Sequence, residues 1–163
     1  MRTYPAWLIG VLAAAVLLPV NAAASPPSFT FNLHVPNTAT ASAGPFAGDT
    51  IRLTGGGSFD SADVVASGSF RIFDPSGAVV ESGTWAATAF TSFVSFGGPN
   101  TGELGGQLKI TVTLTPAHGA PPLIGQPMIV TCAIHAPPGF DEGTTVGDFQ
   151  MKTGGATLFH ENS

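Results

Sequence analysis

Three residues in the middle of the chain have side chains that could bind a small molecule. Arg71, Glu81 and Trp85 stand on either side of the sequence DPSG, residues 74–77. This sequence is typical of a tight turn, because proline presets the first turn position and glycine suits the positive-φ position of a bulge. We therefore expect a β-hairpin whose register places Arg71 opposite Glu81, with Trp85 on the same face.

The direction in which this face points decides its chemistry. If it points inward, an ion pair and an indole ring line a cavity that could bind or turn over a small molecule. If it points outward, Arg71 and Glu81 form a surface cross-strand pair worth less than about 1 kcal/mol. Both faces of the hairpin carry apolar residues, so the direction stays open. We expect ligand binding at Arg71, Glu81 and Trp85, and assign no catalytic residue.

The other reactive residue types form no recognisable motif. No local metal-ligand spacing joins the four histidines, which are His34, His118, His135 and His160. The acidic pairs are typical of turns, and no calcium-loop pattern accompanies them; they are Asp60 with Asp63 and Asp141 with Glu142. The tripeptides SGS and SGT lack the G-x-S-x-G pattern of a hydrolase elbow. We predict no metal site and no cofactor.

Apolar and polar residues alternate with a period of two in most of the chain after residue 24. The clearest runs are FTFNLHV at 29–35 and LKITVTLT at 108–115. Weaker runs span 50–54, 64–73, 78–90, 128–135, 144–151 and 156–160. This pattern predicts an all-β antiparallel meander of about eight or nine strands, closed into a small barrel, with a β-sandwich as the alternative. The segments 36–48, 97–107, 115–127 and 136–143 are expected to be long loops that could carry binding residues.

A glycine and a small hydroxyl residue precede an aromatic ring at three places in the central segment. These tripeptides are Gly57-Ser58-Phe59, Gly68-Ser69-Phe70 and Gly83-Thr84-Trp85. Glycine relieves crowding where a strand bends, and an aromatic ring on the neighbouring strand can cover it. No acid, base or nucleophile constellation accompanies the repeat, so we interpret it as a device for sheet curvature.

The first 24 residues have the features of a signal peptide. Arg2 precedes an apolar stretch at 8–20, and Ala22 and Ala24 occupy the small-residue positions of a cleavage site. We expect cleavage near Ala24, a mature single-domain β-barrel at 25–163, and a secreted or periplasmic location. No later stretch has the ~20 apolar residues of a membrane helix, so we expect no membrane association after cleavage. The single cysteine, Cys132, is expected to be a buried thiol without a disulfide.

The charge of the chain excludes some partners. After cleavage four basic residues would face ten acidic ones, a net charge of −6. Four cations cannot form a surface that follows a phosphate backbone, so we expect no binding to nucleic acid.

The central segment resembles a set of uncharacterised small secreted bacterial β-proteins with the pattern G-x-F-D…V-x-x-G-x-F…G-x-V-x-x-G-T-W-x-A-T. The residues that carry this pattern here are Gly57, Phe59, Asp60, Val65, Gly68, Phe70, Gly77, Val79, Gly83, Thr84, Trp85, Ala87 and Thr88. Further likeness lies in VTC at 130–132, in EG at 142–143 and in TLFH at 157–160. The resemblance covers most of the chain after residue 24 and implies a shared fold, without an activity. More distantly, the chain resembles the barrels of allene oxide cyclases and dirigent proteins, which hold apolar substrates inside.

These observations lead to three functional hypotheses. The first is an exported non-catalytic β-barrel that binds a small apolar molecule or a surface partner. The second is a barrel enzyme of the isomerase or cyclase type, with the substrate held inside by a shaped cavity. The third is a structural protein that forms homo-oligomers through its two-sided apolar hairpin.

Overall fold

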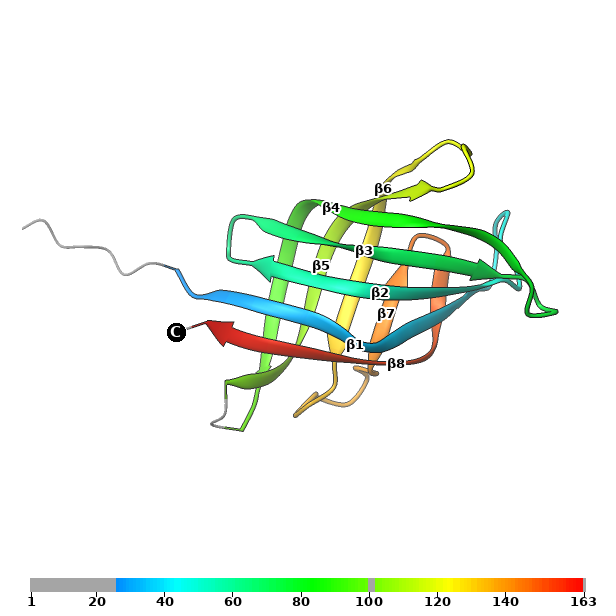
Figure 1. Cartoon of the computed structure of the whole chain (residues 1–163). Helices are drawn as coiled ribbons and strands as arrows, with labels where there is room; N and C mark the ends of the chain where they lie inside the picture. The colour runs from blue at the N-terminus through cyan, green and yellow to red at the C-terminus, as the bar shows by residue number, and fades with distance from the viewer. Residues whose placement is uncertain (1–25, 100–101, 163) are drawn as a thin grey trace, which may run out of the picture.

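The strands of the chain form one closed antiparallel β-barrel (Figure 1). This computed structural model describes residues 26–99 and 102–162. The predicted signal peptide at 1–24 lies outside the described residues. Among the described residues, no helix is long and apolar enough to cross a membrane.

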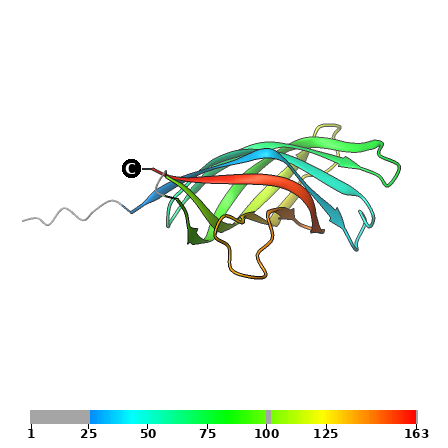
Figure 2. The same cartoon turned by 90° about the horizontal axis from the view of Figure 1, so that it is seen from below.

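Eight strands follow one another around the barrel, and β1 closes the circle by pairing with β8. Their bounds are β1 (Ser28–Ala41), β2 (Thr50–Phe59), β3 (Val64–Phe73), β4 (Val79–Gly97), β5 (Glu103–Pro116), β6 (Leu123–Cys132), β7 (Gly143–Val146) and β8 (Phe149–Asn162). In Figure 1, β1 to β4 cross the front of the barrel and β5 to β7 lie behind them. Seen from below in Figure 2, the connection between β6 and β7 projects away from the barrel wall. The prediction of a small closed all-β barrel is confirmed.

Several strands run further than the alternation predicts. β1 continues to Ala41 through most of the first half of the segment 36–48, which was expected to be a loop. β5 begins at Glu103 and β6 at Leu123, inside two other expected loops. The expected single strand at 144–151 is instead divided between β7 and β8 by a turn at 147–148. These segments are rich in Gly, Pro, Ser and Thr, and neighbouring strands supply the pairing that their own residues do not favour.

The middle of the barrel is filled by apolar side chains. The largest fully buried side chains are Trp85, Phe159, Ile51, Leu53, Ile72, Leu108, Ile110, Leu114, Met128, Val112, Val130 and Val146. Each is less than 2% exposed, so these side chains pack against one another and fill the interior of the barrel. Cys132 is 1% exposed and unpaired, which confirms the predicted buried thiol. A core of this kind is the usual interior of a small eight-stranded barrel.

The turn between β3 and β4 forms as predicted, but the register beyond it is wrong by one residue. The amide of Asp74 donates to the carbonyl of Ala78 at 2.9 Å, and Gly77 has a φ of 87°. Phe73 pairs with Val79, after which a β-bulge shifts the pairing by one position. A bulge inserts one extra residue on one strand, so Arg71 pairs with Ser82 rather than with Glu81, and Glu81 lies on the opposite face of the sheet from Arg71.

Glycine and aromatic residues cover one another across β3 and β4. Gly68 pairs with Trp85, and Phe70 pairs with Gly83. A Cβ atom on Gly83 would lie 2.8 Å from the ring of Phe70, so the ring occupies the space that a side chain would need. This arrangement supports the interpretation of the repeated tripeptides as a curvature device rather than as an active site.

Candidate functional site

The structure separates Arg71 from the other two residues that the sequence placed on one face. Arg71 pairs with Ser82 and is exposed on the outer wall of the barrel, whereas Glu81 pairs with Ile72. Trp85 is 1% exposed in the core, and its indole N–H donates to the carbonyl oxygen of Thr54 at 2.9 Å. The expected pair of Arg71 and Glu81 therefore does not form, because the bulge at Val80 moves Glu81 out of register.

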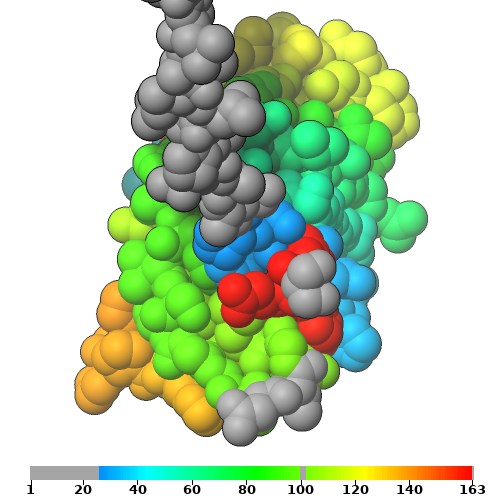
Figure 3. All heavy atoms as spheres, turned by 90° about the vertical axis from the view of Figure 1, so that its left-hand side faces the viewer, coloured from blue at the N-terminus to red at the C-terminus, as the bar shows by residue number. Residues whose placement is uncertain are grey.

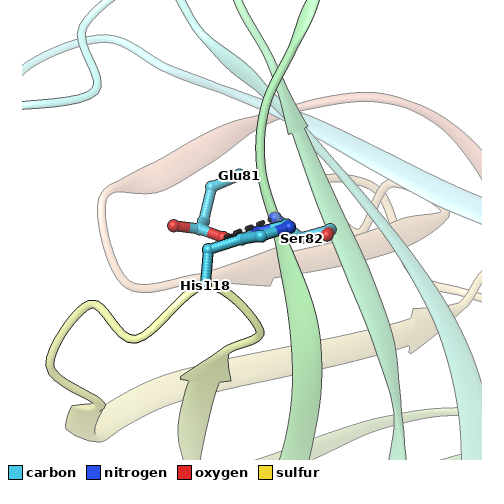
Figure 4. A network of polar contacts seen from close by, with 3 residues as sticks. All are labelled: Glu81, Ser82 and His118. Carbon is cyan, nitrogen blue, oxygen red and sulfur yellow. Dashed lines mark hydrogen bonds and ion pairs between the residues drawn. The ribbon is translucent and has the colours of Figure 1, made fainter.

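Glu81 interacts with a histidine instead (Figure 4). Its Oε1 atom accepts the backbone N–H of Ser82 at 2.8 Å and lies 3.4 Å from Nδ1 of His118. The side chain of His118 is 77% exposed and that of Glu81 is 21% exposed. A polar contact so open to water contributes little to stability, and its groups face solvent rather than a shaped cavity.

Six phenylalanines from four strands gather at one end of the barrel and form what we call the aromatic mouth. They are Phe29, Phe31, Phe59, Phe90, Phe93 and Phe159. Figure 3 faces the end of the molecule where β1 (blue) begins and β8 (red) ends, and Ser28 of β1 pairs there with Asn162 of β8. Neighbouring rings in the cluster have centroids between 4.9 and 6.2 Å apart, which is the usual spacing of interacting aromatic pairs.

The aromatic mouth has a buried floor and a half-exposed rim. Phe31, Phe59 and Phe159 form the floor and are 3%, 4% and 0% exposed. Phe29 at the start of β1 and Phe90 and Phe93 in β4 form the rim and are partly exposed. The ring centroid of Phe93 lies 4.9 Å from those of Phe29 and Phe59 and 5.2 Å from that of Phe159, so Phe93 joins the rim to the floor.

Irregular pairing in β4 brings its phenylalanines to the mouth. Register shifts between Ala87 and Ala89 and between Phe90 and Ser92 let this 19-residue strand bend while it follows β5. Phe93 then covers Gly106 of β5, where an added Cβ would lie 2.6 Å from the ring. β-bulges commonly bend a strand in this way and re-aim its side chains.

A hollow of about 320 Å³ opens between the rim rings. It is lined by Pro27, Phe29, Phe59, Asp60, Ser61, Phe90, Ser92 and Phe93. The carboxylate of Asp60 accepts the backbone N–H groups of Ala62 and Asp63 at 2.7 and 2.9 Å, and these hydrogen bonds lower the pKa of Asp60. Asp60 thus fixes the β2–β3 turn beside the hollow, as expected of a turn residue.

A buried polar cluster ties β1, β7 and β8 together on another side of the barrel. Asn37 is 0% exposed and donates to the carbonyl oxygens of Val35 and Ala156 at 2.9 and 3.2 Å. Its side-chain oxygen accepts the hydroxyl groups of Thr144 and Thr157 at 3.0 and 3.5 Å. Among the described residues, no buried side-chain polar atom lacks a hydrogen-bond partner. The cluster is therefore saturated by the protein itself and is structural.

Charged residues border this cluster without forming a metal site. Glu142 accepts the backbone N–H groups of Ala133 and Thr157, and so fastens the β6–β7 connection to β8. The ammonium group of Lys152 donates to the hydroxyl of Thr131 at 3.1 Å, and burial lowers the pKa of Lys152. Within residues 26–99 and 102–162, no group of three or more His, Cys, Asp or Glu side chains could hold a metal ion.

Comparison of the chain with family models, curated proteins and solved structures finds no match. The aromatic mouth is consequently characterised by its geometry alone. Sequence reasoning missed it because its six rings are spread from residue 29 to residue 159. The one feature of the sequence that could have indicated an aromatic cluster is its composition, since the chain contains twelve phenylalanines and a single tyrosine.

Proposed function

We propose that the protein is an exported, non-catalytic β-barrel that binds a small apolar molecule at the aromatic mouth. The observation that carries this proposal is the hollow of about 320 Å³ between the half-exposed rings of Phe29, Phe90 and Phe93. Small-molecule sites have volumes of roughly 300 Å³ or more and are lined mainly by apolar and aromatic side chains. Export rests on the features of residues 1–24, and N-terminal sequencing of protein recovered outside the cytoplasm, expected to begin near Ser25, tests it.

The mouth fits this role better than the middle of the barrel. Side chains that are less than 2% exposed fill the space around Trp85, so a ligand there would have to displace the core. At the mouth, by contrast, the floor of Phe31, Phe59 and Phe159 is already packed. A ligand would lie between the rim rings and against Phe59 without displacing the floor, and burying exposed apolar surface contributes about 25 cal/mol per Å².

The proposal favours binding over catalysis. A barrel cyclase needs its substrate inside a shaped cavity, and the filled core offers no such space around Trp85. At the mouth the acidic neighbour, Asp60, is occupied by two backbone N–H groups. These hydrogen bonds stabilise its ionised form, which makes Asp60 a weak base.

A second candidate function is self-assembly through the β3–β4 hairpin. Val79 and Val80 are neighbours on this hairpin and are 53% and 52% exposed. Apolar side chains that stay exposed together are typical of contact surfaces. Sedimentation of the wild type and of Val80→Asp tests this candidate, since a dimer through the hairpin would dissociate in the variant and a monomeric wild type would exclude it.

The neutral fluorescent probe N-phenyl-1-naphthylamine tests binding at the mouth. We expect saturable binding to residues 25–163, weakened at least about tenfold by Phe90→Ser and by Phe93→Ser, because each substitution removes a ring from the hollow. Phe96→Ser is the matched control. Phe96 lies in the same strand but packs on Phe140, with ring centroids 4.8 Å apart, and does not line the hollow.

Folding of each variant is monitored through Trp85, the only tryptophan after residue 24. Its emission should be that of a buried indole in every variant that keeps the core. Absence of probe binding by the wild type, or equal weakening by Phe96→Ser and Phe90→Ser in folded proteins, would overturn the proposal.

A further inference from the structure

Two arginines lie directly opposite one another on the outer wall of the barrel. Arg52 of β2 and Arg71 of β3 are cross-strand partners, and both are exposed. They are two of the four lysine and arginine residues in the described part of the chain. Like charges in directly opposite positions of a sheet repel and destabilise it, so this arrangement has a cost that the fold alone does not explain.

Within the described residues, neither of these arginines forms an ion pair with a carboxylate. Between residues 26 and 162, apart from residues 100 and 101, the contact of His118 with Glu81 is the one contact between a basic side chain and a carboxylate. The carboxylate of Asp74, in the nearby hairpin turn, is engaged by the backbone N–H groups of Ser76 and Ala78 and by the hydroxyl of Ser76. The N–H groups of the two guanidinium groups are therefore available to a ligand.

Hydroxyl groups stand beside the arginines on the same face. Thr54 and Ser69 form the cross-strand pair two positions further along β2 and β3, and their side-chain oxygens lie 2.8 Å apart. One hydroxyl donates to the other, which leaves the accepting hydroxyl with a free hydrogen to donate. The wall thus presents two rows of donors, one charged and one neutral.

The two rows border a hollow of about 250 Å³. Its lining residues are Pro36, Arg52, Thr54, Ser69, Phe70 and Arg71. The guanidinium carbon of Arg52 lies 5.5 Å from the centre of the Phe73 ring. A ring under the face of a guanidinium group restrains it while leaving its N–H edge available for planar or bidentate contacts.

We propose that this hollow binds a single phosphate or sulfate group, either as the free ion or as an ester on a larger molecule. Arginine forms bidentate hydrogen bonds with such oxyanions, and two rows of donors approach a tetrahedral group from different directions. A long polyanion does not fit, because the chain has ten acidic residues and, in the part that the structure describes, only these two cations lie next to one another. The site lies on the outer wall and shares no lining residue with the aromatic mouth, so it stands independently of the proposed function.

The test is an amide NMR titration of residues 25–163 with inorganic phosphate at constant ionic strength. We expect saturable shifts centred on residues 52–54 and 69–71. Arg52→Gln and Arg71→Gln should each weaken binding at least about tenfold, since each removes a charged bidentate donor. Lys109→Gln is the control, because Lys109 is an exposed cation in β5 outside this hollow, and should leave binding unchanged.

Thermal unfolding distinguishes phosphate binding at this site from general screening of charges by the salt. Without phosphate, Arg52→Gln and Arg71→Gln should have a higher midpoint than the wild type, because each removes the repulsion between the arginines. Adding phosphate should raise the midpoint temperature of the wild type more than that of either variant, because a ligand that binds the folded state stabilises it. The salting-out effect of phosphate raises the midpoint of all three proteins alike and so does not affect this comparison.

Two further ligands identify the source of the anion. Methyl phosphate binding as tightly as inorganic phosphate would indicate an esterified group, and clear preference for the inorganic ion would indicate the free anion. Equal binding of acetate would overturn the assignment to a tetrahedral oxyanion. Non-saturable shifts, or equal weakening by Lys109→Gln, would overturn the site itself.

Discussion

The indole ring of Trp85 in β4 crosses Gly68 of β3 and reaches Thr54 of β2. A Cβ on Gly68 would lie 2.6 Å from Nε1 of Trp85 and 1.8 Å from the carbonyl oxygen of Thr54. That same nitrogen donates to that same carbonyl at 2.9 Å. The missing side chain at position 68 therefore allows one ring to link three consecutive strands.

Gly68→Ala should destabilise the barrel by about 3 kcal/mol or more. The new methyl group meets backbone atoms on one side and a buried indole on the other, and overpacked cores lose roughly this much free energy. Urea unfolding followed by Trp85 emission measures the loss. Ser67→Ala is the control: this neighbour is exposed on the outer face and should change stability by less than about 0.5 kcal/mol. A stable Gly68→Ala variant would mean that Trp85 does not cross β3 as described.

Trp85→Phe tests the hydrogen bond of the same ring. Phenylalanine keeps an aromatic ring over Gly68 but has no N–H group for the carbonyl of Thr54. We expect a loss of about 2 to 4 kcal/mol, from the unmet carbonyl together with the smaller ring. Circular dichroism must follow unfolding here, because no tryptophan would remain after residue 24. If Trp85→Phe lowered the free energy of unfolding by less than Ser67→Ala does at an exposed position, the buried hydrogen bond would be contradicted.

Asn37→Ala should cost about 2 to 4 kcal/mol of unfolding free energy. Its side chain satisfies the hydroxyls of Thr144 and Thr157 and two backbone carbonyls, all of which would be left without this partner in the interior. Asn32→Ala is the matched control, because Asn32 lies in the same strand with an exposed side chain. Denaturant unfolding of the two variants checks the difference. Equal stabilities would show that water or neighbouring groups replace Asn37.

The elements that the sequence predicted well are those with local causes. The turn at 74–77 depends on Pro75 and Gly77 within four residues, and it forms as expected. Alternation identified the faces of β5 and of β1 as far as Leu33, because each side chain's direction follows from its position in the strand. It failed at Val35, which is 48% exposed where the pairing of β1 is irregular. The glycine and aromatic tripeptides indicated curvature, but the pairing of Gly68 with Trp85 and of Phe70 with Gly83 depends on the bulge and not on local sequence.

What the sequence did not predict depends on contacts between distant residues. The bulge at Val80 leaves no signal in the alternation, yet it shifts Glu81 from Arg71 to a pairing with Ile72. Arg52 and Arg71 are 19 positions apart, and only the β2–β3 register makes them neighbours. The aromatic mouth likewise requires closure of the barrel by β1 and β8, which brings Phe31 to within 6.1 Å of Phe159.

Cys132 should make the barrel less stable in alkaline solution. Burial raises the pKa of its thiol, so the folded protein keeps the proton at a pH where the unfolded chain has lost it. The protonated thiol therefore makes its full contribution to the free energy of unfolding below the ordinary cysteine pKa of about 8.5. This contribution is lost as the pH rises through the raised pKa of the folded state. Denaturant unfolding between about pH 7 and pH 10 measures this loss.

Cys132→Val isolates the thiol from the other group that titrates in this range. Burial lowers the pKa of Lys152, so its effect has the opposite sign: the cost of holding its charge is present below the lowered pKa and disappears as the pH rises towards 10.5. Both proteins contain Lys152, and its effect cancels in their difference. The stability of the wild type relative to Cys132→Val should fall steadily above about pH 8.5. A difference that stays constant with pH would mean that the thiol ionises equally easily in the folded and unfolded chains, which contradicts its burial in the core.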